Sequence, residues 1–300
     1  MPYLGESAAL VTALMFSIGP TFFTLAGRRV GSVVVNRSRL LIATLVLMII
    51  HAAITGGRPL PLAAGGARWL WLGLSGVVGL ALGDAALFQA FVQVGTRLTM
   101  LVFALTPVIA AVLARIVFGE VLRPVQVLAM AVTLAGVAWV VTERGGNGNG
   151  ARERHYLTGL LLALAGATGQ ATGLILAREG LRGDFSAFEG NVIRISCATA
   201  AIWIVALLRR RALPTLRRLR EDLPALRHTA WGALFGPVIG VWLSLVAIRH
   251  TSIGVASTLM ALPPVFLLPI GYFVFGERTG WRAVLGTLVA MAGVTLLFLA

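Results

Sequence analysis

Residues 104–120 read ALTPVIAAVLARIVFGE and residues 261–277 read ALPPVFLLPIGYFVFGE, so nearly the same apolar sequence stands at two places in the chain. The match extends without a gap from residues 83–141 onto residues 240–298, at a constant offset of 157 residues. The repeats of solenoids and propellers are about 20–50 residues long, far shorter than this offset of 157 residues. The sequence therefore predicts a duplication, with two similar halves in one fold.

The composition is that of a membrane protein. Hydrophobic residues make up 58% of the chain and charged residues 12%, and the mean hydropathy is +0.91. A helix needs about 20 mostly apolar residues to cross a bilayer. Ten runs have this character, and none alternates as a barrel strand would. They lie at about 7–27, 38–55, 69–93, 98–118, 124–142, 157–178, 187–208, 230–249, 253–275 and 281–299. We expect an all-α membrane protein with ten transmembrane helices.

One polar segment divides the ten runs into two sets of five. Residues 145–156 are rich in Gly, Asn and Arg, and they read as a flexible linker between a first repeat, 1–144, and a second, 157–300. Because five is odd, the second repeat must start from the opposite side of the membrane. The sequence thus predicts inverted repeats around a central cavity, an arrangement that places a substrate site near the midplane.

The charge pattern also favours a membrane over a nucleic acid as the partner. The formal net charge is +14, and all 25 basic residues are Arg, most of them in short loops between apolar spans. With both termini outside, the inward loops carry 17 Arg and the outward loops 8. Basic loops face the cytoplasm. We therefore predict a bacterial cytoplasmic (inner) membrane protein with its termini outside, and an interfacial helix in the basic loop 209–220.

No cofactor or metal site is expected. The chain has one Cys, Cys197, and four His that are scattered along it, so neither a disulfide nor a thiolate metal site follows. It also lacks a nucleotide-binding motif. An enzyme would need paired acids, a nucleophile with its base, or a metal cluster, and none of these patterns is present.

Asp84 is the leading candidate for a functional residue, because ionisable groups inside a span are costly. Its repeat mate is Val241, so the duplicated scaffold does not require an acid there. A carboxylate at this depth could hold a substrate ammonium or accept a proton. The structural alternative is that Asp84 caps a kink or pairs with an Arg. The nearby Gly73, Gly76, Gly79 and Gly83 have the spacing of close helix packing.

Further candidates for substrate contact are one amide and several apolar side chains. Gln170 lies in span 6 on a face of small residues, where it could bind substrate or merely bond a neighbouring helix. Trp242 follows the mate of Asp84 directly. Phe88, Met15, Phe103 and Met260 complete a lining suited to an apolar substrate, although each could equally serve packing alone.

Prolines recur at matched positions within spans 4 and 9, and acids recur at the ends of the same spans. Pro107 and Pro264 are repeat mates, and Pro263 precedes the second. Such prolines would kink the spans, and they could act as hinges of a gate or reflect helix shape alone. Glu120 and Glu277 end the matching Phe-Gly-Glu turns, and we expect them to be structural.

Two five-helix units, each with the Pro and Phe-Gly-Glu pattern followed by a Val-Leu and Ala-Gly-Val helix, resemble the EamA-type ten-helix proteins of the drug/metabolite transporter superfamily. The resemblance covers nearly the whole chain and is closest to bacterial aromatic amino-acid exporters. Arg39 and Arg194 match the basic residue of that family near the starts of spans 2 and 7. The resemblance implies that spans 1, 3, 4, 6, 8 and 9 line the cavity and that spans 5 and 10 lie at the periphery.

The leading hypothesis is a secondary transporter that exports amino acids, above all aromatic or other apolar ones, or similar small metabolites by alternating access. Its partners would be that small molecule and the lipid bilayer, and a monomer would suffice. The main alternative is a proton-coupled cation or drug antiporter, which needs a free acid in the membrane. A phosphate exchanger would need central basic groups, whereas Arg97 and Arg115 lie toward span ends.

Overall fold

The computed structural model describes residues 3–119, 123–144, 150–183, 185–250, 259–260, 262–276 and 280–299. Within these ranges the chain is helical and contains no β-strand. Seven of the described helices are long and apolar enough to cross a membrane, and two shorter apolar ones, Pro263–Phe275 and Trp281–Leu296, lie near the C-terminus. Together with the passage from Leu223 to His250, these make the ten spans expected. The predicted all-α membrane fold is confirmed.

The first half supplies five passages, two of which are made of shorter pieces. Spans 1 and 2 are α1 (Leu4–Val30) and α2 (Ser32–Ile54). After the short η1 (Leu62–Ala64), span 3 consists of α3 (Gly66–Gly76), the π-helix η2 (Val77–Gly83) and α4 (Asp84–Val94). Span 4 is divided into α5 (Thr96–Phe103) and α6 (Thr106–Phe118), and span 5 is α7 (Pro124–Arg144).

The second half repeats this plan. It begins with α8 (Gly150–Gly180) and α9 (Ala187–Leu208), which are followed by α10 (Ala212–Glu221) in the loop between spans 7 and 8. Span 8 consists of α11 (Leu223–Ala233), the π-helix η3 (Leu234–Gly240) and α12 (Val241–His250). The chain ends with α14 (Pro263–Phe275) and α15 (Trp281–Leu299).

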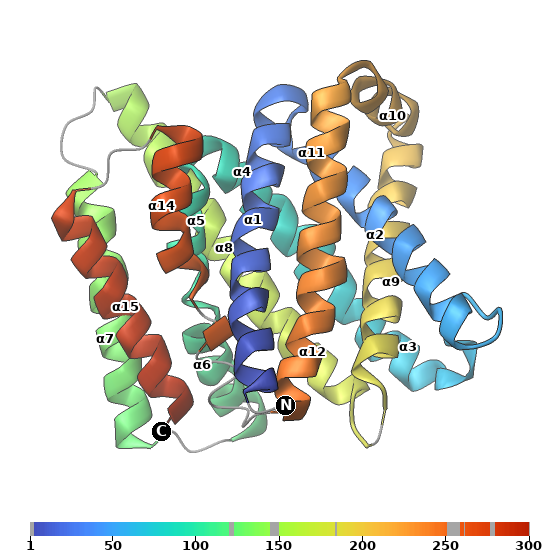
Figure 1. Cartoon of the computed structure of the whole chain (residues 1–300), viewed down its shortest axis with the longest axis horizontal. Coiled ribbons are helices and arrows are strands. Elements are labelled where there is room, and N and C mark those ends of the chain that lie inside the picture. The colour runs from blue at the N-terminus through green and yellow to red at the C-terminus, as the bar shows by residue number, and fades with distance from the viewer. Residues whose placement is uncertain are drawn as a thin grey trace.

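The two halves are inverted and interlocked. In Figure 1, α1 rises from the end where both termini lie, whereas α8 starts at the opposite end and descends. Helix α1 packs on α11, η3 and α12 of the other half, and α8 packs on α3, η2 and α4 in the same manner. The mates α2 and α9 pack on each other, as do α7 and α15. Each half thus buries its first span against the third span of the other.

Glycines allow this close packing. A Cβ on Gly169 of α8 would lie 2.7 Å from the Cα of Gly83, and one on Gly173 would lie 3.1 Å from the Cα of Gly79. The first distance is too short for a Cβ and the second is tighter than most Cβ contacts, so the two backbones meet directly. Small residues are the usual means of joining helices in lipid, where no hydrophobic force drives them together. The packing role predicted for the span 3 glycines is confirmed.

The matched prolines begin helices and do not kink them. Pro107 occupies the first turn of α6, and Pro263 and Pro264 occupy the first turn of α14. The backbone N–H groups of a first turn have no acceptor within the helix, so proline is tolerated there at no cost in hydrogen bonds. The expectation of a proline inside a continuous helix is therefore wrong for these three. Pro20, in contrast, lies within the unbroken α1.

Candidate functional site

Two π-helical segments mark the same point in each half. The π-helix η2 spans Val77–Gly83 and η3 spans Leu234–Gly240, which differ by the repeat offset of 157 residues. A π segment inserts a residue into the helical hydrogen-bond ladder and often accompanies a functional site. Asp84 follows the first segment directly and Val241 follows the second. These segments could not be predicted from the sequence, because hydropathy does not report hydrogen-bond register.

Asp84 is buried against an arginine of the neighbouring span. Only 7% of Asp84 and 5% of Arg39 are exposed, and the Nη2 of Arg39 donates a hydrogen bond to the Oδ2 of Asp84. The Nε of Arg39 donates to the Oδ1 of Asn36 at 3.1 Å. Its guanidinium lies over the Phe88 ring, 4.7 Å from the centroid. The arginine partner considered as the structural alternative for Asp84 is therefore present.

Arg194 is the repeat mate of Arg39. Asn36 and Arg39 in α2 match Asn191 and Arg194 in α9 at an offset of 155 residues. At the same offset, the hydroxyls of Thr44 and Thr199 form a hydrogen bond of 2.7 Å. The two arginines are thus related by the pseudo-symmetry of the molecule, and each lies in the N-terminal part of its span.

The two mates differ in their partners. The Nε and Nη2 atoms of Arg194 are buried and make no hydrogen bond in the described part of the chain. Arg194 lies close enough to Asp84 for their charges to interact, but Asp84 is already bonded to Arg39. The mate of Asp84 is the apolar Val241. Among the described residues, the buried Arg39 and the partly buried Arg194 therefore share one acid, which leaves a positive charge inside the membrane domain.

Gln170 lies beside the π segment of span 3. Its Oε1 is buried without a hydrogen-bond donor among the described residues, and it is 3.0 Å from the position of a Cβ on Gly79. The Oε1 of Gln93 is likewise buried and unpaired, whereas that of Gln89 accepts a hydrogen bond from Ser32. An unpaired buried acceptor is costly. Gln170 thus combines a central location with an unsatisfied polar atom.

The predicted apolar lining falls into separate places. Phe88 is buried in one cluster with Phe23, whose ring centroid is 4.9 Å away, and Phe103 packs against this cluster. Met260 packs instead with Ala8, Ala9 and Ala247, and Met15 is partly buried in α1. Trp242 is 59% exposed, unlike the buried Asp84. Phe88 and Phe103 alone share a cluster with the Arg39 region, through the Arg39 contact with the Phe88 ring.

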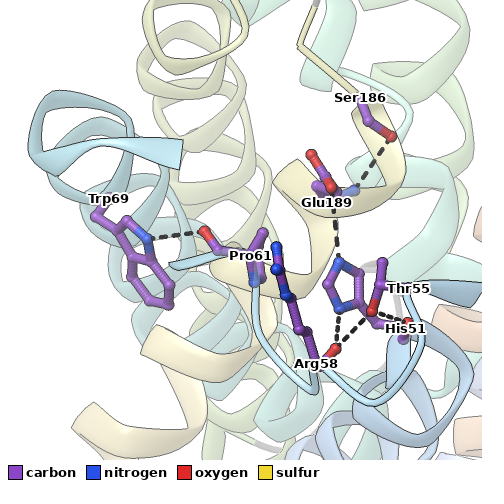
Figure 2. A network of polar contacts seen from close by, with 7 residues as sticks. All are labelled: His51, Thr55, Arg58, Pro61, Trp69, Ser186 and Glu189. Carbon is purple, nitrogen blue, oxygen red and sulfur yellow. Dashed lines mark hydrogen bonds and ion pairs between the residues drawn. The ribbon is translucent and has the colours of Figure 1, made fainter. Parts of the chain in front are cut away.

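A second polar network ties the halves together near one end of the spans. His51 at the end of α2 is buried, and its Nδ1 lies 2.7 Å from the carbonyl oxygen of Arg58. Its Nε2 lies 3.6 Å from the Oε1 of Glu189 in the first turn of α9 (Figure 2). The hydroxyl of Thr55 donates to the same Arg58 carbonyl at 2.9 Å. This network holds the loop after span 2 against α9, and no motif in the sequence predicts it.

Two further predictions concern metals and the matched acids. Among the described residues, no group of three or more His, Cys, Asp or Glu side chains could hold a metal ion. Glu120 and Glu277 lie outside the described residues, so their structural role stays a prediction.

Comparisons with known proteins agree with the repeat. Residues 3–142 and 157–299 each match the EamA-like transporter family. No curated protein matches the chain. The chain is similar to a solved structure described as "Crystal structure of protein", with 18% sequence identity and a TM-score of 0.62. The match covers 97% of this chain and 95% of the other, and at this identity it bears on the fold alone.

Proposed function

The chain belongs to the EamA-like transporter family, and we propose that it exports amino acids, above all aromatic or other apolar ones, or similar small metabolites. Membership makes it a multi-pass membrane transporter of the drug/metabolite transporter superfamily, a group of transporters and not of enzymes. The substrate class, the cytoplasmic membrane and the direction of transport belong to the proposal.

The observation that carries the proposal is the charge of the site. Asp84 is the only acid far from the ends of the spans, and it is bonded to Arg39. A cation or drug antiporter needs a carboxylate that is free to exchange a cation for a proton. The Arg39, Asp84 and Arg194 group carries an excess of positive charge, which suits a substrate with an anionic group and disfavours a lone cation. The charge of the site therefore favours a transporter of amino acids over a cation antiporter.

Alternating access is supported by the matched irregularities of the two halves. The π segments η2 and η3 occupy equivalent points of spans 3 and 8, and the helix starts at Thr106 and Pro263 follow equivalent breaks in spans 4 and 9. Broken helices at the repeat interface are typical of secondary transporters. We propose Pro107, Pro263 and Pro264 as the pivots of these segments. Because both halves belong to one chain, a monomer in the bilayer would suffice.

The test is transport by the purified protein in proteoliposomes. Labelled Phe, Trp, Thr and Met and a quaternary cation dye are supplied with and without an imposed pH gradient, and protein-free liposomes give the background. We expect saturable flux of at least one amino acid, with the dye excluded. Gradient-driven dye flux in the absence of amino-acid flux would overturn the proposal in favour of the cation antiporter.

A further inference from the structure

The repeat mates Arg39 and Arg194 present the same edge of the guanidinium to different surroundings. In Arg39, Nε donates to Asn36 and Nη2 donates to Asp84. In Arg194, these same two atoms, Nε and Nη2, are buried and have no acceptor in the described part of the chain. The sequence accounts for the difference, since Val241 stands where the second half would need the equivalent of Asp84.

We infer that Arg194 binds the carboxylate of the transported substrate, and this inference rests on the function proposed above. The Nε–H and Nη2–H bonds of a guanidinium are parallel, and such a pair grips both oxygens of one carboxylate. A substrate carboxylate would occupy the role that Asp84 plays for Arg39. It would also neutralise a charge that is expensive to keep inside a membrane.

Gln170 is placed to hold the amino group of the same molecule. A Cβ on Gly76 would overlap the carbonyl oxygen of Arg194, and a Cβ on Gly79 would lie 3.0 Å from the Oε1 of Gln170. Gly76 and Gly79 are three residues apart, a rise of about 4.5 Å along a helix. The backbone of Arg194 in α9 and the side-chain amide of Gln170 in α8 therefore contact span 3 at neighbouring positions.

These two side chains have complementary needs. Within the described ranges, the Nε–H and Nη2–H groups of Arg194 have no acceptor, and the Oε1 of Gln170 has no donor. An α-amino acid zwitterion supplies both, because its carboxylate accepts and its ammonium donates. Sites built around such bonds reject analogues that cannot form them, since the buried groups are then left unpaired. The structure thus favours a free amino acid over its amide, its ester or the corresponding amine.

The first experiment needs no mutation. Binding of labelled Phe to the full-length protein in detergent is challenged with unlabelled Phe, phenylalanine amide, phenethylamine and phenylpropionate. We expect the amide and the amine, which lack the carboxylate, to compete roughly 10- to 100-fold less well than Phe, the range of a lost charge-assisted hydrogen bond. Phenylpropionate, which keeps the carboxylate, should compete better than either. Equal competition by Phe and its amide would overturn the inference.

The second experiment changes the arginine. Arg194→Gln should weaken Phe binding roughly 10- to 100-fold, and Arg194→Lys, which keeps the charge but loses the paired N–H groups, should fall between it and the wild type. Arg218→Gln, an exposed arginine of α10, is the control and should bind as the wild type does. Unchanged Phe affinity in Arg194→Gln would also overturn the inference.

A stability readout separates binding from folding. Arg39→Gln removes the hydrogen-bonded partner of Asp84 and should lower the thermal midpoint. Arg194→Gln removes a guanidinium whose Nε and Nη2 have no acceptor among the described residues, and it should leave the midpoint unchanged or raise it. A drop in Arg194→Gln as large as in Arg39→Gln would mark Arg194 as structural. If the wild type binds and transports none of the four amino acids, the proposed function itself fails. If it does so but Arg194→Gln is indistinguishable from it, the carboxylate site alone fails.

Discussion

Asp84 and Arg39 show how a polar pair is kept inside an apolar domain. Both side chains are buried, Asn36 and the carbonyl of Leu80 accept further bonds from the guanidinium, and the Phe88 ring covers it. A buried pair of this kind adds little net stability, yet removal of one partner leaves an uncompensated charge. Asp84 is therefore held in place by Arg39, and it is not free to move with a substrate.

We predict that Asp84→Asn lowers the free energy of unfolding by about 3–5 kcal/mol, the cost of breaking a buried ion pair. The double variant Asp84→Asn with Arg39→Gln should recover part of this loss, because neither charge is then left unpaired. Thermal unfolding in detergent provides the measurement for all four members of the cycle. Simple addition of the two single effects would show that the side chains are not coupled.

The sequence could identify Asp84 but not its partner. The depth of an acid within a span follows from hydropathy, and its repeat mate follows from the offset. The contact with Arg39 joins two spans whose residues are 45 positions apart, and it depends on how the spans are rotated about their axes. Likewise Trp242 directly follows the mate of Asp84 and is expected to face in the second half as Asp84 does in the first, yet Trp242 is exposed and Asp84 is buried.

At the scale of elements, span 3 packs on its neighbours through glycines, whose backbone contacts the backbone of other helices directly. Gly76 meets the backbone of α9, while Gly66, in the first turn of α3, has no neighbour within 4 Å of a Cβ position. We predict that Gly76→Ala separates α3 from α9 and costs about 1–3 kcal/mol, as overpacking does. Gly66→Ala is the matched control and should leave thermal stability unchanged. Equal midpoints for the two variants would contradict the close contact.

The start of α11 is tied to the end of α1 by a charged cap. Asp222 accepts a hydrogen bond from the backbone N–H of Ala225 at 2.9 Å and forms an ion pair with the Nε of Arg29 at 2.8 Å. The Arg29 guanidinium, together with the Ala225 amide, holds the pKa of the Asp222 carboxyl below its usual range. The contact joins the first half to the second at the end of the spans near α10.

This cap predicts a dependence on pH. A lowered pKa means that the contribution of Asp222 is fully present above about pH 4, the range of an unperturbed Asp, and is lost as the pH falls through the lower folded value. The thermal midpoint of Asp222→Asn should therefore lie below that of the wild type at pH 7, and the gap should close on acidification. Glu221→Gln, at an exposed pair with Arg217, is the control. A gap for Asp222→Asn that is as large at pH 3 as at pH 7 would contradict the assignment.

Element boundaries were predictable only where hydropathy changes. The ten apolar runs correspond to the ten spans, since length and apolarity alone decide what can cross the membrane. The π segments and the break before Thr106 lie inside apolar runs, where composition carries no trace of hydrogen-bond register. The two π segments η2 and η3 are 157 residues apart, which is the repeat offset. If one of them is known, the repeat predicts the other.

On the scale of the whole molecule, the fold fixes which ends lie on the same side. Both termini lie at one end of the spans and α10 lies at the other (Figure 1). The buried side chains of α10 are Ala212, Thr215 and Leu219, while its arginines at 217, 218 and 220 are exposed. An amphipathic basic helix of this kind suits an anionic membrane surface. We therefore propose that α10 lies on the cytoplasmic leaflet and that the termini lie outside.

Cysteine labelling tests this orientation. In a Cys197→Ala background, single cysteines at Ala63, in the loop after span 2, and at Glu221, at the end of α10, are both exposed. A membrane-impermeant maleimide applied to spheroplasts should label Ala63→Cys but not Glu221→Cys, and lysis should expose both. The opposite pattern would place the termini inside.

The excess of arginines in the inward loops can be reduced by mutation. In the proposed orientation these loops carry 17 Arg and the outward loops carry 8. Replacement of arginines 209–211, 217, 218 and 220 by Gln reduces the inward count to 11, and Glu221→Cys in that background should become partly accessible, since the excess of inward arginines orients the chain.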